Sequence, residues 1–253
     1  MKIEIVKCLT DNYSYLIFDE KTLNSAVVDP SDSGPIINKI EKNNLKLKYI
    51  FNTHHHYDHV GGNKKLKEKY NCKVVGFEKD KDRIPEIDIV LKDNQKWKNE
   101  LFECSILHIP GHTSGHICIY IKELKALFTG DTLFSLGCGR IFEGTYEEMY
   151  KSLSKLKNFP LNTRIYCGHE YTKKNSDFCL SIDSKNSKLI NKINEINKNI
   201  QNEKPTIPSI LEDELECNIF LRSDNMEIQK RLGINKDEPI KTFAKLRDLK
   251  DNF

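Results

Sequence analysis

The chain carries four of its eight histidines in one short stretch, Thr53-His54-His55-His56-Tyr57-Asp58-His59, which also holds an aspartate. An apolar run at residues 47–51 comes directly before it and predicts a buried strand. Burying several polar side chains together is costly unless a partner satisfies them, and a metal ion is the usual partner. The stretch therefore predicts a metal site, with a solvated histidine-rich loop as the alternative.

The spacing inside the stretch favours two donor pairs. His54 and His56 are two residues apart, so in extended backbone their side chains point the same way and can bind one ion. Asp58 and His59 follow the turn and aim at a different point, which suits a second, neighbouring ion. We interpret His55, which lies between the pairs, as solvated. Imidazole and carboxylate donors without thiolate suit Zn²⁺, Fe or Mn.

Three later segments also place chemically competent side chains beside glycine. They are Pro110-Gly111-His112-Thr113-Ser114-Gly115-His116, Thr129-Gly130-Asp131-Thr132 and Cys167-Gly168-His169-Glu170-Tyr171. Each segment follows an apolar run, so each is expected to be a loop that leaves the same edge of a sheet. Glycine lets such a loop turn tightly and lets a ligand approach the backbone.

The rest of the chain predicts an α+β fold that can position these loops. Strands are expected at 2–8, 13–18, 25–28, 47–51, 74–77, 102–109, 117–121, 126–128 and 164–167, with helices at 36–45, 63–70 and 146–156. Two strand-rich halves, each with helices, indicate two sheets packed face to face with helices outside. Beyond residue 172 we expect no strand, only helices near 189–200 and 240–249. The predicted domains are 1–172 and 173–253.

Composition restricts the possible partners and the compartment. The chain has 253 residues with 40 Lys and Arg against 37 Asp and Glu, which gives no excess of basic charge for nucleic acid or an anionic membrane. It has no apolar run near the roughly 18 residues that a membrane span needs. The eight cysteines form no C-x-x-C pair, and no signal peptide is apparent. These features predict reduced thiols and a cytoplasmic protein, and they do not define its oligomeric state.

The order of the motifs resembles the metallo-β-lactamase superfamily. That resemblance rests on T-H-x-H-x-D-H followed by the Pro-Gly-His-Thr, Gly-Asp-Thr and Gly-His segments. Within the superfamily the chain is similar to the glyoxalase II family of hydroxyacylglutathione hydrolases. The residues that carry this finer likeness are Leu9-Thr10-Asp11-Asn12-Tyr13, Phe128 to Phe134, Gly137-Cys138-Gly139-Arg140, Glu143-Gly144-Thr145 and Cys167-Gly168-His169-Glu170-Tyr171-Thr172. The resemblance implies a four-layer αββα sandwich followed by a C-terminal helical domain.

The resemblance also implies a complete ligand set for two divalent metal ions, with Zn²⁺ preferred and Fe or Mn as alternatives. The first ion would be held by His54, His56 and His112, the second by Asp58, His59 and His169, with Asp131 shared between them. Asp58 would also be the catalytic residue, orienting the attacking water or accepting its proton. Asp29 is a candidate acceptor for a ligand imidazole. His108 and His116 are expected to be core histidines or to support ligands.

The activity implied by the family is hydrolysis of the thioester S-D-lactoylglutathione to D-lactate and glutathione, the second step of methylglyoxal detoxification. Glutathione carries two carboxylates, so its site needs cations and hydrogen-bond donors. The matching positions are Arg140, Phe142, Tyr171, Asn175, Arg247 and Lys250. Two of them depart from the family pattern, because relatives often have Lys where Arg140 stands and Tyr where Phe142 stands.

Two other classes of function compete with this interpretation. The first is another enzyme of the superfamily, either a lactonase or a one-iron enzyme such as a persulfide dioxygenase. One metal ion per chain and no thioesterase activity would favour the one-iron enzyme. A non-enzymatic binding module of the same fold typically loses ligands, and no ligand is missing from this sequence. Serine hydrolase and nucleotide chemistry are not supported, because G-x-S-x-G and a phosphate-binding glycine loop are both absent.

Overall fold

The computed structural model describes residues 1–234 and 238–253 and divides the chain into two compact units. Unit 1 comprises Met1–His108 and Ser114–Gly130, and unit 2 comprises Ile109–Thr113 and Asp131–Phe253. The chain thus enters unit 2 briefly before it returns to complete unit 1. Among the described residues, no helix combines the length and the apolar character needed to cross a membrane.

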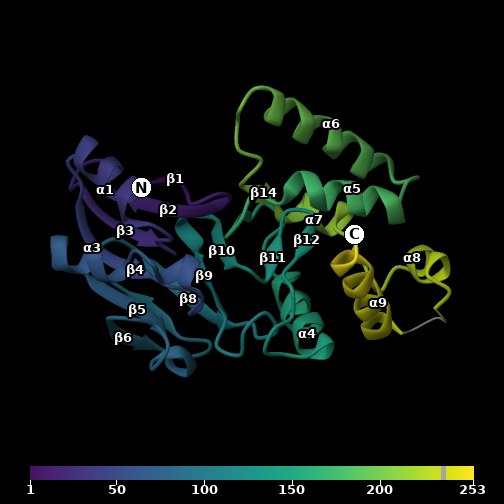
Figure 1. The fold of residues 1–253 in the computed structure, drawn as a ribbon, viewed down its shortest axis with the longest axis horizontal. Helices are drawn as coiled ribbons and strands as arrows, with labels where there is room; N and C mark the ends of the chain where they lie inside the picture. Colours follow the sequence, from purple (N-terminus) through teal and green to yellow (C-terminus); the bar gives the residue numbers. More distant parts are fainter. Residues whose placement is uncertain (235–237) are drawn as a thin grey trace. The chain divides into compact units, whose positions relative to one another are not determined.

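The first sheet of unit 1 has the strand order β1-β2-β3-β4-β5-β6 (Figure 1). Its strands are β1 (Lys2–Cys8), β2 (Asn12–Phe18), β3 (Asn24–Val28), β4 (Lys46–Phe51), β5 (Lys73–Phe77) and β6 (Ile87–Leu91). The pairs from β1 to β3 are antiparallel and those from β3 to β6 are parallel. Parallel pairs need crossover connections, which α1 (Ser33–Lys42) and α3 (Asn63–Tyr70) supply.

The two crossover helices cover one face of this sheet. Ile36 and Ile40 of α1 and Leu66 of α3 are fully buried in a cluster with Leu16 and Val27 of the sheet. Asp32 caps α1, since its side chain accepts a hydrogen bond from the Gly34 N–H at 3.0 Å. Burial of this apolar stripe stabilises the helices far more than their own propensity could.

The opposite face of the sheet packs on four antiparallel strands in the order β10-β9-β8-β7. These strands are β7 (Lys96–Lys98), β8 (Glu103–His108), β9 (Ile117–Ile121) and β10 (Ala126–Gly130), and short 3₁₀ turns lie at η1 (Glu78–Asp80) and η2 (Lys122–Leu124). Aromatic rings join the sheets: Tyr15 lies 5.4 Å from Phe128, and Phe51 lies 5.6 Å from Trp97, between ring centroids. Unit 1 is therefore layered as helices, sheet and sheet.

Polar residues gather where the parallel strands of unit 1 end. Asp29 follows β3, Asn52 to His54 follow β4, and Asp80 lies just beyond β5. The backbone pairing continues past the strands, with Asp29 N–H donating to the Phe51 carbonyl at 2.8 Å. Carboxyl ends of adjacent parallel strands share one edge, which is where ligands bind in open α/β sheets. The histidine-rich stretch, including the short α2 (Tyr57–Val60), lies at that edge.

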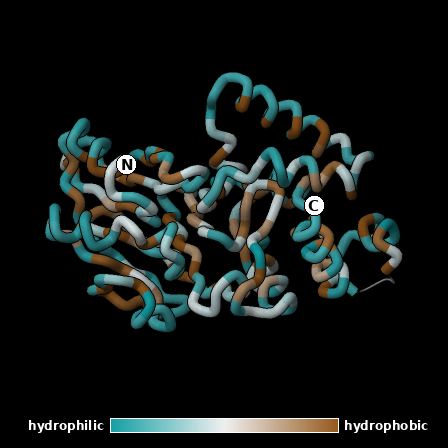
Figure 2. Tube along the Cα trace, viewed as in Figure 1, coloured by the Kyte–Doolittle hydropathy of each residue, from teal (hydrophilic) through white to brown (hydrophobic). Residues whose placement is uncertain are grey.

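Unit 2 is mainly helical. Its elements are β11 (Leu133–Phe134), β12 (Gly137–Cys138), α4 (Tyr146–Leu156), β13 (Arg164–Cys167), α5 (Thr172–Ile182), α6 (Ser187–Gln201), β14 (Ser209–Ile210), α7 (Leu211–Cys217), α8 (Met226–Arg231) and α9 (Pro239–Asp251). A capping box of Thr145 and Glu148 starts α4. In α6, Leu189, Ile193 and Ile196 are buried, and apolar and polar residues alternate along this helix in Figure 2.

Most elements predicted from periodicity are confirmed within a few residues of their expected ends. The expectation that no strand follows residue 172 is wrong, because β14 pairs with β13, with Ile165 opposite Ser209. A two-residue strand is too short to show alternation. Helix α5 was also not identified, since Phe178 is the one large apolar residue on its buried face, which otherwise consists of small and polar residues such as Asn175 and Ser176.

Substituting Ile40→Ala tests the helix layer of unit 1. Because Ile40 is 1% exposed, the change should lower the free energy of unfolding by about 2–5 kcal/mol. Ile37→Ala in the same helix is the matched control and should cost about 1 kcal/mol, since Ile37 is only partly buried. Urea unfolding followed by fluorescence of Trp97, the only tryptophan, reports on unit 1. Equal losses for the two variants would contradict this layer.

Candidate metal centre

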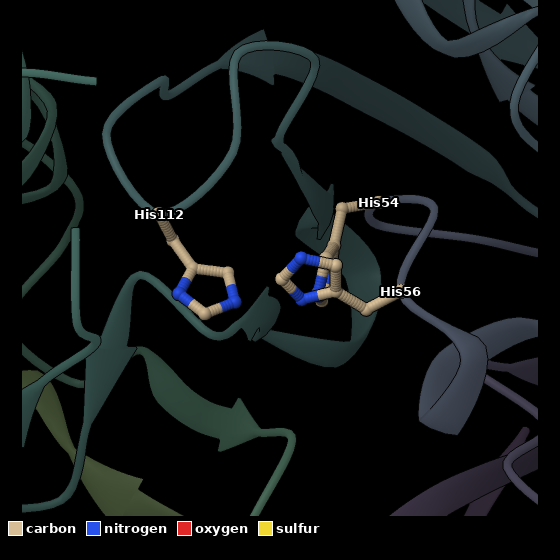
Figure 3. Close-up of side chains that lie close together, drawn as sticks. All are labelled: His54, His56 and His112. Atoms are coloured by element: carbon tan, nitrogen blue, oxygen red, sulfur yellow. The ribbon is translucent and has the colours of Figure 1, made fainter. Parts of the chain in front are cut away.

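The loop after β4 brings four donors of unit 1 together. The imidazoles of His54 and His56 lie close to each other on this loop, with ring centroids 4.7 Å apart (Figure 3). His54 and His59 also present ligand atoms within 4.8 Å of each other. The carboxylate Oδ2 of Asp58 lies 3.7 Å from Nε2 of His59, at the start of α2. The pairing of donors expected from the spacing is therefore possible in the folded loop.

A buried carboxylate, Asp29, organises this loop. It accepts hydrogen bonds from the Thr53 N–H at 2.8 Å, from the Thr53 hydroxyl at 2.7 Å and from His59 Nδ1 at 3.0 Å. Since Asp29 is 2% exposed, its charge has these donors in place of water. Its φ of 49° is left-handed, a conformation that Asp tolerates better than most residues. The expected role of Asp29 as an acceptor for a ligand imidazole agrees with this geometry.

Thr53 extends the same network to a second histidine. Its hydroxyl donates to Asp29, so it can accept a hydrogen bond from His54 Nδ1, which lies 3.0 Å away. The imidazole of His116, fully buried, stacks on His54 with centroids 4.6 Å apart and 22° between the planes. His54 is thus held from one side by a hydroxyl and from the other by a ring. The expectation that His116 is a core or ligand-supporting histidine is confirmed.

His55 does not lie free in solvent as we expected. Its Nδ1 is 3.3 Å from Oδ2 of Asp80, a carboxylate with no exposed surface, and its side chain is 18% exposed. Arg83 also pairs with Asp80, and it donates to the Ser114 hydroxyl at 3.0 Å. Sequence spacing gave no sign of this, because the partner lies 25 residues away on the turn after β5.

Asp58, the expected catalytic carboxylate, is oriented by Asn12. The Asn12 side chain donates to Oδ2 of Asp58 at 3.0 Å and to its backbone carbonyl at 3.1 Å. Asn12 is 5% exposed, at the start of β2. Sequence analysis assigned no role to Asn12, Thr53 or Asp80. The family motif from Leu9 to Tyr13 includes Asn12, but the motif does not show that Asn12 is hydrogen-bonded to Asp58.

The remaining three donors lie in unit 2. His112 Nε2 is 3.5 Å and His169 Nε2 is 3.2 Å from the same oxygen, Oδ2 of Asp131. Nδ1 of His112, whose side chain is drawn in Figure 3, donates to the Arg140 carbonyl at 2.8 Å. The His169 ring stacks on Tyr171 with centroids 4.8 Å apart and 4° between the planes. One carboxylate between two imidazoles is the arrangement that a shared metal ligand needs.

The donor chemistry fits metal ions. In three histidines Nδ1 contacts a carboxylate, a hydroxyl or a carbonyl, which leaves Nε2 for a metal, as is usual for ligating imidazoles. These are His54, His59 and His112. The groups that could hold a metal ion contain seven different imidazole and carboxylate donors, more than the four that one tetrahedral zinc ion takes. The cluster therefore suggests binding of two metal ions, and it does not identify the metal.

The cysteines near these donors are unsuited to bind or react. All eight cysteines are free and buried, as predicted. Burial raises the pKa of the Cys138 thiol to about 11, and it raises the pKa of Cys167 further still. Both residues therefore remain neutral thiols near pH 7, whereas metal binding and nucleophilic attack need thiolates. This agrees with a donor set of imidazole and carboxylate only.

The six expected substrate-binding residues all lie in unit 2, and they differ in exposure. Arg140 and Phe142 are 63% and 62% exposed, and Tyr171 is 37% exposed. Asn175 and Arg247, each 4% exposed, are buried. The Asn175 amide donates to the Ser135 carbonyl at 3.0 Å. The exposed members of this set can therefore be reached from solvent, whereas the side chains of Asn175 and Arg247 are enclosed by protein.

Near the end of α9, cations and one carboxylate form a small network. Asp251 lies 3.3 Å from Arg140 Nε and 2.8 Å from Arg247 Nη2. Lys250 donates to the Lys174 carbonyl at 3.1 Å, and its ammonium lies 5.3 Å from the ring centroids of Phe178 and Phe253. The network has an excess of positive charge, which favours an anionic ligand.

Family models match nearly the whole chain. The model described as the metallo-beta-lactamase superfamily matches residues 10–97 and 98–169, and that of the hydroxyacylglutathione hydrolase C-terminus matches residues 170–253. The hydroxyacylglutathione hydrolase of Pelagibacter ubique is 56% identical over 253 residues, all of both chains. These matches support the family expected from the motifs.

Solved structures show the same fold. The crystal structure of ETHE1 from Myxococcus xanthus superposes with a TM-score of 0.67 at 21% identity, covering 99% of this chain and 100% of that one. TTHA1623 in a di-iron-bound form gives a TM-score of 0.55 at 26% identity over 65% of this chain and 90% of that one. The predicted α+β fold class, a metallo-β-lactamase fold with a C-terminal extension, is confirmed.

Substituting Asp29→Asn tests the carboxylate that organises the loop. Asparagine tolerates the left-handed backbone, but the change removes the charge and replaces one of the two accepting oxygens by an amide nitrogen, so at least one hydrogen bond from Thr53 or His59 is lost. Loss of such a partner should weaken zinc binding by about 10–100-fold, measured by competition with a chelator. Asp32→Asn is the control, because Asn caps helix α1 as well as Asp does. Zinc affinity unchanged in Asp29→Asn would rule out this role.

Proposed function

The chain belongs to the hydroxyacylglutathione hydrolase family, and we propose that it hydrolyses S-D-lactoylglutathione to D-lactate and glutathione, the second step of methylglyoxal detoxification. The observation that carries the proposal is identity of 56% to a hydroxyacylglutathione hydrolase over the full length of both chains. All seven expected metal donors are present in the sequence, and this supports metal-dependent hydrolysis.

The metal centre of the proposal has two ions. His54, His56 and His112 would hold the first ion, Asp58, His59 and His169 would hold the second, and Asp131 would be shared. Zn²⁺ is preferred for imidazole and carboxylate donors, with Fe or Mn as alternatives. The di-iron form of TTHA1623 supports two ions on a chain of this fold. Hydrogen bonds from Nδ1 of His54, His59 and His112 support Nε2 as their ligand atom.

Two bound divalent ions would lower the pKa of water toward neutrality and would polarise the thioester carbonyl. Asp58 takes the proton of the attacking water or orients it, and Asn12 fixes the carboxylate for that task. The leaving group is the glutathione thiolate, whose conjugate acid has a pKa of about 8.5. It departs without a strong general acid, and the proposal assigns none.

Exposed and partly buried residues of unit 2 bind the glutathione part of the substrate. Arg140, Phe142, Tyr171 and Lys250 contact it with charge, ring surface and hydrogen bonds. Asn175 and Arg247, which are buried, belong to the same glutathione-binding set in this proposal. The helical domain 173–253 contributes to this site, and residues 1–172 form the catalytic domain. Arg140 and Lys250 complement the carboxylates of glutathione.

The proposal places the protein in the cytoplasm. Eight free, buried cysteines are typical of a reducing compartment, where disulfides do not persist. Neither nucleic acid nor a membrane is a partner in this proposal, which agrees with the near-balanced charge of +3.

The decisive experiment follows loss of thioester absorbance from S-D-lactoylglutathione with the metal-loaded protein. Turnover should disappear on chelation and return with Zn²⁺. Asp58→Asn should lower kcat by about 10²-fold or more, because it affects both a ligand and the proton acceptor. Asp82→Asn, an exposed aspartate of the same unit, is the matched control and should leave kcat unchanged. A metal-loaded protein without turnover would refute the proposal.

The pH dependence of KM tests the assignment of Lys250. Burial, with help from the charges of Arg247 and Lys174 and against that of Asp177, lowers the pKa of Lys250 to about 8. The ammonium is charged below this pH and neutral above it, so binding of an anionic substrate should weaken as pH rises through about 8.

The measurement is KM for the thioester between pH 7 and about 9. KM should rise several-fold in the wild type, and it should stay flat in Lys250→Arg, because arginine keeps its charge throughout this range. The wild type and Lys250→Arg serve as each other's control. Identical KM profiles for both would exclude Lys250 from carboxylate binding.

A further inference from the structure

The guanidinium of Arg247 is held inside unit 2 by two groups. Its Nη1 donates to the Cys138 carbonyl at 2.7 Å, and its Nη2 donates to Asp251 at 2.8 Å. The residue is 4% exposed, and the ring of Phe220 lies 5.2 Å from the guanidinium carbon. A buried arginine with a backbone carbonyl as partner fixes that piece of backbone, in addition to any effect of its charge.

The backbone that Arg247 fixes continues directly into the metal donors. Cys138 ends β12, and the next residue, Gly139, donates to the Thr132 carbonyl at 3.2 Å. A Cβ on Gly139 would lie 1.9 Å from the Asp131 carbonyl oxygen and 3.2 Å from His112 Nδ1. The segment 138–140 is therefore packed against two expected ligands, with no space for a side chain at its centre.

The same segment ends on a hydrogen bond to a ligand. The Arg140 carbonyl accepts from His112 Nδ1 at 2.8 Å, which turns Nε2 of that ring toward Asp131 Oδ2 at 3.5 Å. A shift of the segment would therefore turn the imidazole. Three links in series, Arg247 to Cys138, Cys138 to Arg140 and Arg140 to His112, join helix α9 to the metal-binding nitrogen.

We propose that Arg247 is a positioning residue for His112, acting through the backbone of residues 138–140. The proposal rests on the proposed metal centre and not on the thioester substrate. Arginine suits the task because its planar fork bonds the Cys138 carbonyl and Asp251 at once, whereas a lysine ammonium would reach one of them. Helix α9 thereby contributes to metal affinity as well as to the substrate site.

The test measures binding of Zn²⁺ alone, by chelator competition, with no substrate present. In Arg247→Met one of the two zinc ions should bind about 3–10-fold more weakly, less than the about 10–100-fold for loss of a direct partner, and the other should be unchanged. Arg247→Lys keeps the charge and one bond, so its loss should be smaller, about 2–3-fold.

Arg231→Met is the matched control. Arg231 also donates to a backbone carbonyl, that of Ile182, and to a carboxylate, Asp183, both at 2.8 Å, but it does not touch residues 138–140. Its zinc affinity should equal that of the wild type. Wild-type affinity for both ions in a folded Arg247 variant, or equal weakening in Arg231→Met, would overturn the proposal. A wild-type protein that binds no zinc would contradict the metal centre itself.

Discussion

The carboxylate of Asp29 is the group on which the first half of the metal centre depends. It is buried at the end of β3, and it collects hydrogen bonds from the backbone and side chain of Thr53 and from His59. A buried charge without such donors would be strongly unfavourable, so folding of unit 1 and the shape of the ligand loop require each other. The parallel pairing of β3 with β4 is what brings the carboxylate and the loop to the same edge.

Much of the centre could be predicted from sequence because its information is local. The donors of the stretch from His54 to His59 lie on one short loop, and strand periodicity places that loop at a sheet edge. Glycine-flanked segments identified His112, Asp131 and His169 for the same reason. The likeness to a known family then assigned each donor to an ion. The distribution of ligands between two ions remains a prediction.

Local sequence patterns could not predict contacts between residues that are distant in the chain. His55 looked solvated because its partner, Asp80, lies on another strand connection, and Asn12 gave no hint that it holds Asp58. The burial of Arg247 is the clearest case. The sequence predicted a glutathione-binding cation at this position, and it gave no sign that the side chain points inward to a carbonyl 109 residues away. Hydrophobic periodicity shows which residues lie on the same face of a helix or strand. It does not show which residues elsewhere in the chain pack against that face.

One consequence concerns how such a protein can change over evolution. The segment from Ser135 to Cys138 is bonded by the side chains of Asn175, Glu214, Asn218 and Arg247, all of which follow residue 172. A shortened chain ending at residue 172 would retain every metal donor yet lose all four of these supports. Exchange of the tail by recombination at that boundary would therefore leave residues 135–138 without four hydrogen bonds, unless the new tail supplied replacements.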